Sequence, residues 1–169
     1  MDGRVTEIFS AAQIEARVAA LAAGIRQAYG DSELTVLATL EDAFVFLADL
    51  SRQLQGPLRT GFLRYDQRTH GGGQDLQFST RTDVAGRAVL LVEGVLGTGV
   101  PQEYVMRQLL ERGARELKLC VLVDKPARRR VELTPDWRAF ETAADYVVGY
   151  GLGLNERWRN LPYLARIGG

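Results

Sequence analysis

The stretch Arg87-Ala-Val-Leu-Leu-Val-Glu-Gly-Val-Leu-Gly-Thr-Gly99 decides the fold that we expect for this chain. Residues 87–92 form its most strand-like run, because nearly all of them are apolar. A glycine-containing turn follows at 97–99, and residues 102–112 then carry the pattern of a helix that Gly113 can end. A buried strand, a turn and a helix in this order are typical of proteins in which strands and helices alternate.

The same alternation extends to both sides of this stretch. Ser10-Ala-Ala-Gln13 has the form of a capping box, and Gly30 can end the helix that begins there. Apolar residues recur in it at helical spacing: Ile14, Val18, Leu21, Ile25 and Ala28. We expect a second helix at 42–54 and further strands at 34–40, 58–65, 76–79, 117–123 and 146–150. Three segments are expected to be irregular: a mobile, glycine-rich loop at 66–74, a basic loop at 125–130 and the C-terminus.

Alternating strands and helices predict an α/β fold with a mostly parallel sheet flanked by helices. The sequence has no internal repeat and no visible domain boundary, so we expect residues 1–169 to form a single domain. In such sheets, ligands bind beyond the carboxyl ends of the strands. Four loops are therefore candidates for a functional site, those that follow Leu40, Val92, Val123 and Tyr150.

The composition argues against several classes of protein. With 46% hydrophobic residues, the 169-residue chain can bury a core. Its 21 basic and 21 acidic side chains give no net charge, so we expect no broad nucleic-acid-binding surface. Its apolar runs are too short to cross a membrane, and Met1–Arg4 shows no signal sequence. One cysteine, Cys120, and one histidine favour a buried thiol in a reducing cytoplasm, without disulfide or zinc.

Several segments, in register along the chain, are similar to segments of one enzyme family. They are Ala43-Phe-Val-Phe-Leu-Ala-Asp-Leu50, residues 89–99, Leu122-Val-Asp-Lys-Pro-Ala-Arg-Arg129, Tyr146-Val-Val-Gly-Tyr-Gly-Leu152 and Arg159-Asn-Leu-Pro-Tyr163. From about Ile8 to Ile167 the chain therefore resembles the hypoxanthine-guanine phosphoribosyltransferases, which are type I phosphoribosyltransferases. The resemblance implies a small C-terminal hood segment. It also implies the reaction of purine salvage, in which hypoxanthine or guanine is joined to phosphoribosyl pyrophosphate with Mg²⁺, giving the nucleotide and pyrophosphate.

The resemblance assigns three residues to purine binding. Lys125 matches the lysine that donates a hydrogen bond to the 6-oxo group, and an ammonium group can only donate, which favours an oxo purine over adenine. Tyr146 matches the aromatic residue that stacks on the purine, and Val147 matches the position whose backbone meets the base edge. From the residues alone, Lys125 could equally be a solvated lysine of a basic loop, and Tyr146 could fill the core.

Further matches concern the ribose and the phosphates. Glu93 matches an acidic residue that accepts the ribose hydroxyl protons, and Arg159 matches an arginine directed at pyrophosphate. Thr98 and Gly99 belong to a strand-to-helix turn whose N–H groups can bind the 5′-phosphate, although such a sequence alone is often only a turn. Arg64-Tyr65 matches the flexible loop that closes over the site.

Five positions differ from the pattern of the family. Glu41-Asp42 replaces lysine and glycine of the pyrophosphate loop, which places negative charge where phosphate would bind. Gly94 replaces the second of two acidic residues. Gly97 replaces the acid/base residue near the purine N7 and can transfer no proton. Gly153 replaces an aspartate that reaches Mg²⁺ through water.

Together, these matches and differences predict a divergent member of the family that binds a purine base or nucleotide with weak or no catalysis. One alternative is an active purine phosphoribosyltransferase that makes IMP or GMP and needs Mg²⁺. The other is a scaffold that binds a partner protein and no small ligand. We assign no catalytic residue and no metal ligand from the sequence. The resemblance also implies a homodimer or homotetramer, without nucleic acid or membrane as a partner.

Overall fold

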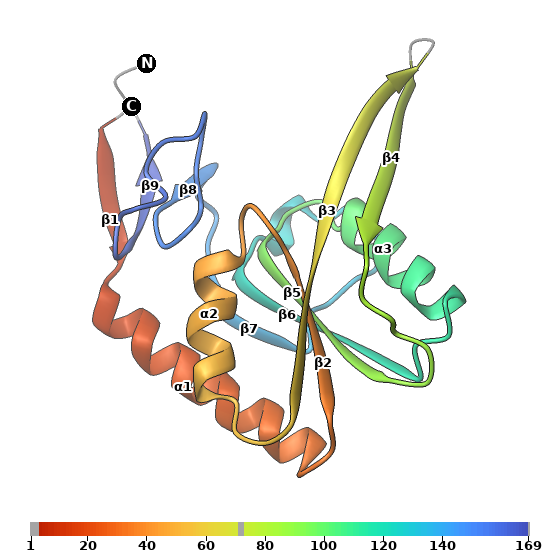
Figure 1. Cartoon of the computed structure of the whole chain (residues 1–169). Coiled ribbons are helices and arrows are strands. Elements are labelled where there is room, and N and C mark those ends of the chain that lie inside the picture. Colours follow the sequence, from red (N-terminus) through yellow and green to blue (C-terminus); the bar gives the residue numbers. More distant parts are fainter. Residues whose placement is uncertain (1–3, 71–72, 169) are drawn as a thin grey trace.

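The computed structural model describes residues 4–70 and 73–168, apart from the side chains of residues 66–77. Its elements are β1 (Val5–Phe9), α1 (Ala11–Tyr29), β2 (Leu34–Thr39), α2 (Phe44–Gln53), β3 (Leu58–His70), β4 (Gly73–Thr80), β5 (Ala88–Leu96), α3 (Val100–Glu111), β6 (Glu116–Asp124), β7 (Trp137–Glu141), β8 (Tyr146–Val148) and β9 (Leu164–Ile167). They form a six-stranded sheet of order β4-β3-β2-β5-β6-β7 and a three-stranded sheet of order β1-β9-β8 (Figure 1).

The six-stranded sheet is parallel except at one edge. β3, β2, β5, β6 and β7 run parallel to their neighbours, and only β4 runs antiparallel, against β3. α1 and α2 lie on one face of this sheet and α3 on the other (Figure 1). The predicted α/β fold, a mostly parallel sheet flanked by helices, is therefore confirmed.

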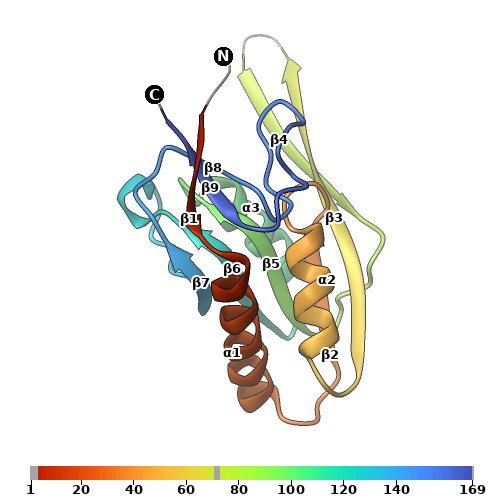
Figure 2. The ribbon, with the colours of Figure 1, turned by 90° about the vertical axis from the view of Figure 1, so that its left-hand side faces the viewer.

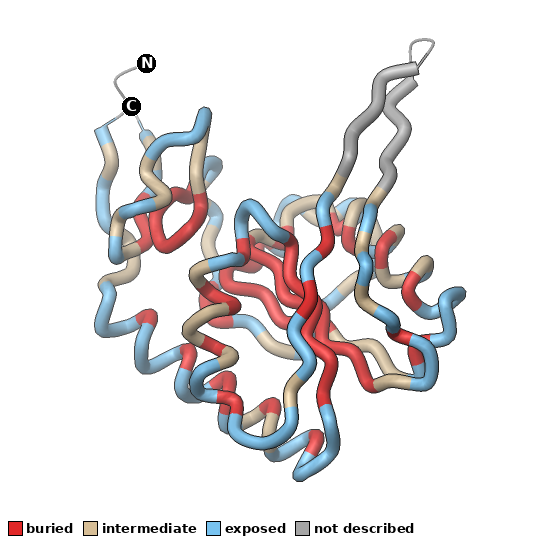
Figure 3. The backbone as a smooth tube through the Cα atoms, viewed as in Figure 1, coloured by how far each residue is buried: buried red, intermediate tan, exposed pale blue. Residues whose placement is uncertain are grey.

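The central strand β5 shows why this sheet forms. Leu90 and Val92 are fully buried and pack in the cluster that α1 and α2 cover, while Val89 and Leu91 are fully buried in the cluster that α3 covers. Because side chains alternate between the two faces of a strand, a continuous apolar run fits a sheet covered on both sides. Figure 3 shows this burial concentrated in the central strands. Each such side chain contributes roughly 1.5–3 kcal/mol to folding.

The beginning of α1 matches the sequence prediction in detail. The Ser10 hydroxyl accepts a hydrogen bond from the Gln13 backbone N–H at 3.2 Å, and the Gln13 side chain accepts one from the Ser10 N–H at 2.8 Å. This reciprocal pair satisfies two N–H groups that a helix start would otherwise leave free. At the other end, the Gly30 N–H donates to the Arg26 carbonyl, so the helix ends where expected.

The smaller sheet corrects the prediction that the C-terminus is irregular. The strand expected at 146–150 is β8, which ends at Val148 and pairs with β9, and β9 pairs with β1, so the last part of the chain forms a strand. We call β1, β8, β9 and residues 149–163 the hood. The hood lies beside the carboxyl ends of the parallel strands of the main sheet (Figure 2). β1 and β9 are short and pair across almost the whole chain, which leaves no local sequence signal.

The expected mobile loop at residues 66–74 is wrong for most of its length. β3 continues to His70, β4 begins at Gly73, and the two strands pair in antiparallel register from Leu63↔Thr80 to His70↔Gly73. Residues 71–72 lie outside the described residues. Polar residues can form such a ribbon because the backbone supplies its hydrogen bonds. Arg64 and Tyr65 consequently lie in a strand, not in a loop.

Two expectations from the composition can be compared with the structure. Cys120 is fully buried in β6, and burial raises the pKa of its thiol above the usual range, so it acts as a small apolar residue. Among the described helices, none is both long and apolar enough to cross a membrane.

Candidate active site

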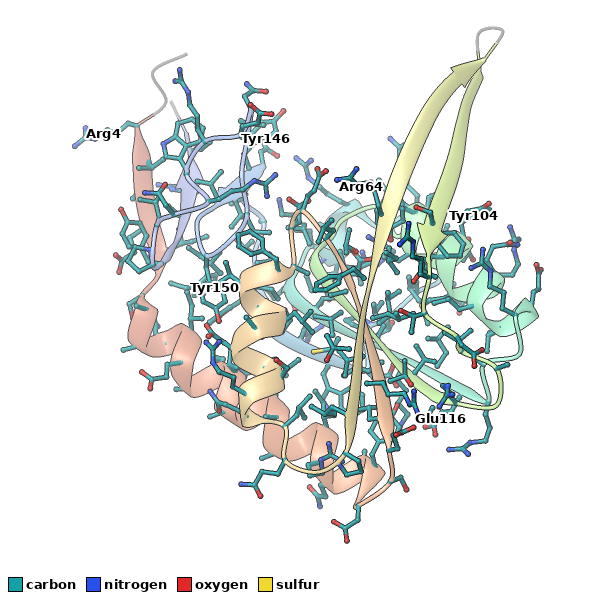
Figure 4. The ribbon with its side chains drawn as sticks, viewed as in Figure 1. Arg4, Arg64, Tyr104, Glu116, Tyr146 and Tyr150 are labelled. Atoms are coloured by element: carbon teal, nitrogen blue, oxygen red, sulfur yellow. The ribbon has the colours of Figure 1, made fainter. Side chains whose placement is uncertain are left out.

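The parallel strands end beside the hood, and side chains from both parts meet there. β2, β5 and β6 all finish at this edge, as the rule for parallel sheets requires. Figure 4 shows Tyr146 on the hood and Arg64 on β3, both at this end of the molecule. Arg159 of the hood donates hydrogen bonds to Glu41 and Asp42 in the loop after β2, and Lys125 after β6 donates to Asp145, which directly precedes the hood strand β8.

Lys125 begins the turn after β6 and is buried, with only 7% of its surface exposed. Its ammonium group donates to the Asp145 backbone carbonyl at 3.0 Å, which leaves two further donors on the nitrogen. Burial lowers the pKa of this lysine, and the neighbouring Arg128 charge lowers it further. The solvated lysine of a basic loop is therefore excluded.

Tyr146 and Val147 are the first two residues of β8, directly after Asp145. Tyr146 is 56% exposed, so it does not fill the core and its ring is free to stack on a ligand. Val147 is buried, and its backbone lies in the antiparallel ladder with β9, opposite Arg166. The hydrogen bond from Lys125 to Asp145, the residue before Tyr146, thus brings a buried cationic donor close to the strand that carries an exposed aromatic ring.

Glu93 is a buried carboxylate at the end of β5, with 3% of its surface exposed. It accepts a hydrogen bond from the Tyr65 hydroxyl at 2.7 Å and a longer one from the Gln102 amide at 3.4 Å. Burial raises the pKa of Glu93, while the hydrogen bonds from Tyr65 and Gln102 act in the opposite direction. The carboxylate that the resemblance assigns to the ribose hydroxyls is therefore already in contact with protein donors.

The raised pKa of Glu93 predicts a pH-dependent cost to folding. The folded chain holds the proton of the Glu93 carboxyl group more tightly than the unfolded chain does. The stability that the protonated carboxyl group contributes is therefore complete below the pKa of the unfolded chain. It is lost as the pH rises through the higher pKa of the folded chain. Glu93→Gln should therefore melt roughly 2–4 °C above the wild type at pH 7. The difference should shrink toward pH 4 in thermal melts followed by circular dichroism. A difference in melting temperature that does not change with pH would contradict a raised pKa of Glu93.

Carbonyl groups of the turn 97–99 between β5 and α3 accept hydrogen bonds from residues that follow β6. Arg129 donates to the carbonyls of Leu96 and Gly97, and the Arg130 N–H donates to the Thr98 carbonyl at 2.9 Å. In a planar trans peptide the N–H points away from the carbonyl. The N–H groups of residues 97–99 therefore point to the other side, next to the start of α3, where an anion is favoured.

Arg129 is itself fixed by a buried ion pair. Its guanidinium group binds Asp124, whose side chain is almost completely buried at the end of β6 and also pairs with Arg138 at 3.2 Å. This role of Arg129 could not be predicted from the sequence, because the residue stands in a basic stretch that we expected to be a loop. Gln102 was missed for the same reason, since no sequence pattern marks it as a partner of Glu93.

The loop after β2 is tied to the hood by one arginine. Arg159 Nη1 donates to the Glu41 carbonyl at 2.5 Å, to the Asp42 carboxylate at 2.8 Å and to the Gly151 carbonyl at 2.7 Å. Arg64 lies 3.6 Å from the Glu41 carboxylate. A small cavity of about 190 Å³ adjoins this loop, lined by Thr39, Leu40, Glu41, Asp42, Arg64 and Tyr65.

The three glycines at altered positions have different surroundings. A Cβ atom at Gly94 would lie 2.6 Å from the Asp42 backbone oxygen, and one at Gly153 would lie 2.8 Å from Arg159 Cγ. A Cβ atom at Gly97 would meet nothing within 4 Å. Gly94 is thus required by close packing against backbone, and Gly153 lies against the Arg159 side chain, whereas the space beside Gly97 is open.

This contrast predicts a difference in stability between two variants of the same loop region. Gly94→Ala should destabilise the fold by roughly 1–3 kcal/mol, because the added methyl group overlaps backbone that cannot rotate away. Gly97→Ala should change the free energy of unfolding by only about 0.5 kcal/mol. Urea denaturation of both variants checks this. Equal losses would mean that Asp42 does not lie against β5.

Comparison with known proteins decides the family. Residues 4–157 match the phosphoribosyl transferase domain. The chain is 34% identical to the hypoxanthine phosphoribosyltransferase of Haemophilus influenzae, over 96% of this chain and 95% of that protein. It belongs to the hypoxanthine-guanine phosphoribosyltransferase family. It is also 31% identical to the hypoxanthine-guanine phosphoribosyltransferase of Bacillus subtilis, over 94% of this chain and 90% of that protein.

Solved structures of this family have the same fold. A hypoxanthine-guanine phosphoribosyltransferase from Bacillus anthracis superposes with a TM-score of 0.90 at 28% identity, covering 99% of this chain and 100% of that one. A hypoxanthine phosphoribosyltransferase from Trypanosoma cruzi gives 0.89 at 26% identity, with 99% and 93% covered. The type I phosphoribosyltransferase fold expected from the sequence is therefore established.

Enzymes of this family generally use Mg²⁺, but the described carboxylates near the strand ends are not arranged to hold it. In the part of the chain that the structure describes, no three histidine, cysteine, aspartate or glutamate side chains cluster closely enough to hold a metal ion. Glu93 faces Tyr65 and Gln102, and Asp42 pairs with Arg159. A Mg²⁺ ion would have to take its oxygen ligands largely from the phosphates of a bound substrate and from water.

Proposed function

We propose that this chain is a purine phosphoribosyltransferase of low turnover, which joins hypoxanthine or guanine to phosphoribosyl pyrophosphate and releases IMP or GMP and pyrophosphate. The observation that carries the proposal is the buried Lys125 ammonium, which is bonded to the backbone of Asp145, directly before the exposed Tyr146. Relatives over nearly the full length of the chain are hypoxanthine phosphoribosyltransferases, which supports the same class of reaction.

The purine half of the proposed site determines which base is taken. Two free N–H donors of Lys125 can bind the 6-oxo group, whereas the 6-amino group of adenine would place a donor against a donor. Stacking on Tyr146 would add about 1–3 kcal/mol and does not depend on the base. The backbone of Val147, fixed in the hood sheet, would meet the base edge. We therefore expect oxo purines to be preferred.

The donor half of the proposed site is our reason for proposing a low turnover. The N–H groups of residues 97–99 would bind the 5′-phosphate, and Glu93 would accept the ribose hydroxyls once Tyr65 releases it. Gly97 offers no group that can exchange a proton with the purine, so water must do so, and a positioned acid or base usually contributes about 10²–10⁴-fold. Any Mg²⁺ would arrive with the phosphates of the substrate.

A second function, binding of a purine nucleotide without turnover, is favoured by one specific observation. Both groups assigned to the donor substrate already have partners within the chain, Tyr65 on Glu93 and Asp42 on Arg159. Such a protein would bind IMP or GMP and act as a sensor or regulator. For either function we infer a homo-oligomer in the cytoplasm.

The experiment that separates these functions combines binding and turnover. Thermal melting is measured with guanine, GMP, IMP, and phosphoribosyl pyrophosphate with Mg²⁺, because a ligand of the folded state raises the melting temperature. IMP formation from hypoxanthine is then followed at high enzyme concentration. Measurable IMP supports the transferase, and stabilisation by GMP or IMP without any product supports the binder. No stabilisation at millimolar ligand would overturn both and favour a scaffold.

A further inference from the structure

The contact between Arg159 and Asp42 joins two residues that lie 117 positions apart in the sequence. Asp42 stands in the loop between β2 and α2, and Arg159 stands in the hood. The pair is partly exposed, with 30% of the Arg159 side chain and 51% of the Asp42 side chain accessible. Two backbone carbonyls, of Glu41 and Gly151, accept from the same guanidinium nitrogen. We call this arrangement the Arg159 latch.

The Arg159 latch lies against two glycines. The Arg159 side chain passes so close to Gly153 that a Cβ atom there would lie 2.8 Å from its Cγ and 2.9 Å from its Nε. The Asp42 backbone lies so close to Gly94 that a Cβ atom there would lie 2.6 Å from the Asp42 oxygen. Gly94 thus lets the loop that carries Asp42 lie against β5, and Gly153 leaves room for the Arg159 side chain that reaches it.

In this contact, a carboxylate of the chain itself occupies an arginine that could bind the anionic group of a ligand. A guanidinium group binds carboxylate and phosphate oxygens with the same donors, so Asp42 and a bound pyrophosphate would compete for Arg159. The Asp42 carboxylate would also repel the pyrophosphate charge directly. A nucleoside monophosphate avoids this competition, because its base meets Lys125 and its phosphate meets residues 97–99.

We propose that Asp42 determines the ligand specificity of this site, by occupying Arg159 and so favouring purine nucleoside 5′-monophosphates over ligands that carry a pyrophosphate group. The inference rests on the proposed function for the place where the purine binds. It does not depend on turnover. The site thus separates ligands by their phosphate groups as well as by their base.

The test compares Asp42→Asn with the wild type by isothermal titration calorimetry, using inorganic pyrophosphate, phosphoribosyl pyrophosphate and GMP, each with Mg²⁺. Asparagine keeps the size of the side chain and removes its charge. Asp42→Asn should bind pyrophosphate and phosphoribosyl pyrophosphate about tenfold more tightly, since it releases Arg159 to donate a charged hydrogen bond, which contributes about that much to affinity. The affinity for GMP should change less than about twofold. Asp31→Asn, an exposed aspartate in the turn before β2, removes the same charge elsewhere and should change nothing.

A double variant tests whether the effect passes through the arginine. Asp42→Asn combined with Arg159→Gln should lose most of the gain in pyrophosphate affinity. The proposal is overturned if the gain persists without Arg159, if GMP tightens as much as pyrophosphate, or if no variant binds pyrophosphate at all. Failure of the proposed function looks different: IMP formation would be absent while Asp42→Asn still gained pyrophosphate affinity. Turnover without that gain would refute only the latch.

Discussion

Gly97→Asp is expected to raise the rate of IMP formation by about 100-fold, because a positioned general acid or base typically contributes 10²–10⁴-fold. The structure allows this change, since a Cβ atom at Gly97 would meet nothing within 4 Å and the φ angle there lies outside the left-handed region. The new carboxyl group would stand at the end of β5, beside the N–H groups of residues 97–99. Steady-state kinetics with hypoxanthine and phosphoribosyl pyrophosphate measure the effect as kcat.

Gly97→Asn is the matched control for this prediction. Asparagine has the same shape and restricts the backbone equally, but it cannot transfer a proton at neutral pH. It should therefore keep the wild-type rate, and only the aspartate variant should gain a new dependence on pH. Equal gains in both variants would assign the effect to backbone ordering. If Gly97→Asp stays at the wild-type rate, the acidic loop at 41–42 is sufficient to block the reaction.

The sequence predicts the parts of the fold whose signal is local. The run 87–92 has one structural solution, because its residues are apolar on both faces of a strand, and the Ser10 capping box fixes the start of α1. The expected strands at 58–65 and 76–79 lie within β3 and β4, but the extension of both strands toward residues 70 and 73 escapes this kind of prediction, since cross-strand backbone pairing, rather than an apolar pattern, forms it. β1 pairs with β9 across the length of the chain, and no short window contains both strands.

The candidate site divides in the same way. Lys125 and Tyr146 follow from motifs that resemble the family, and their burial and exposure agree with the proposed roles. The glycines at positions where the family has acidic residues can be seen in the sequence, but what they contact cannot. In the sequence, Gly94 and Gly153 look like simple losses, whereas in the structure Gly94 lies against the Asp42 backbone and Gly153 against the Arg159 side chain. Such coupling between distant positions becomes visible only when the side chains are placed in space.

Lys125→Met is expected to weaken the binding of IMP and GMP by roughly 10–150-fold, because a hydrogen bond from a charged group contributes about 1.5–3 kcal/mol. Methionine fills a similar volume and offers no donor. AMP, which gains nothing from Lys125, should lose less than about threefold. The preference for oxo purines should therefore collapse, as measured by calorimetric titration of IMP, GMP and AMP.

The melting temperature of Lys125→Met shows whether a loss of purine affinity comes from the missing donor or from unfolding. Burial lowers the pKa of Lys125, which means that the folded chain loses free energy by keeping the charge there. Below the lowered pKa, Lys125→Met removes that cost together with the bond to Asp145, so the melting temperature should stay within a few degrees of the wild type. Arg128→Met, which removes a neighbouring exposed charge paired with Asp145, should leave purine affinity within a few-fold. If IMP and AMP lose affinity equally in Lys125→Met, the lysine only supports the hood and does not read the base.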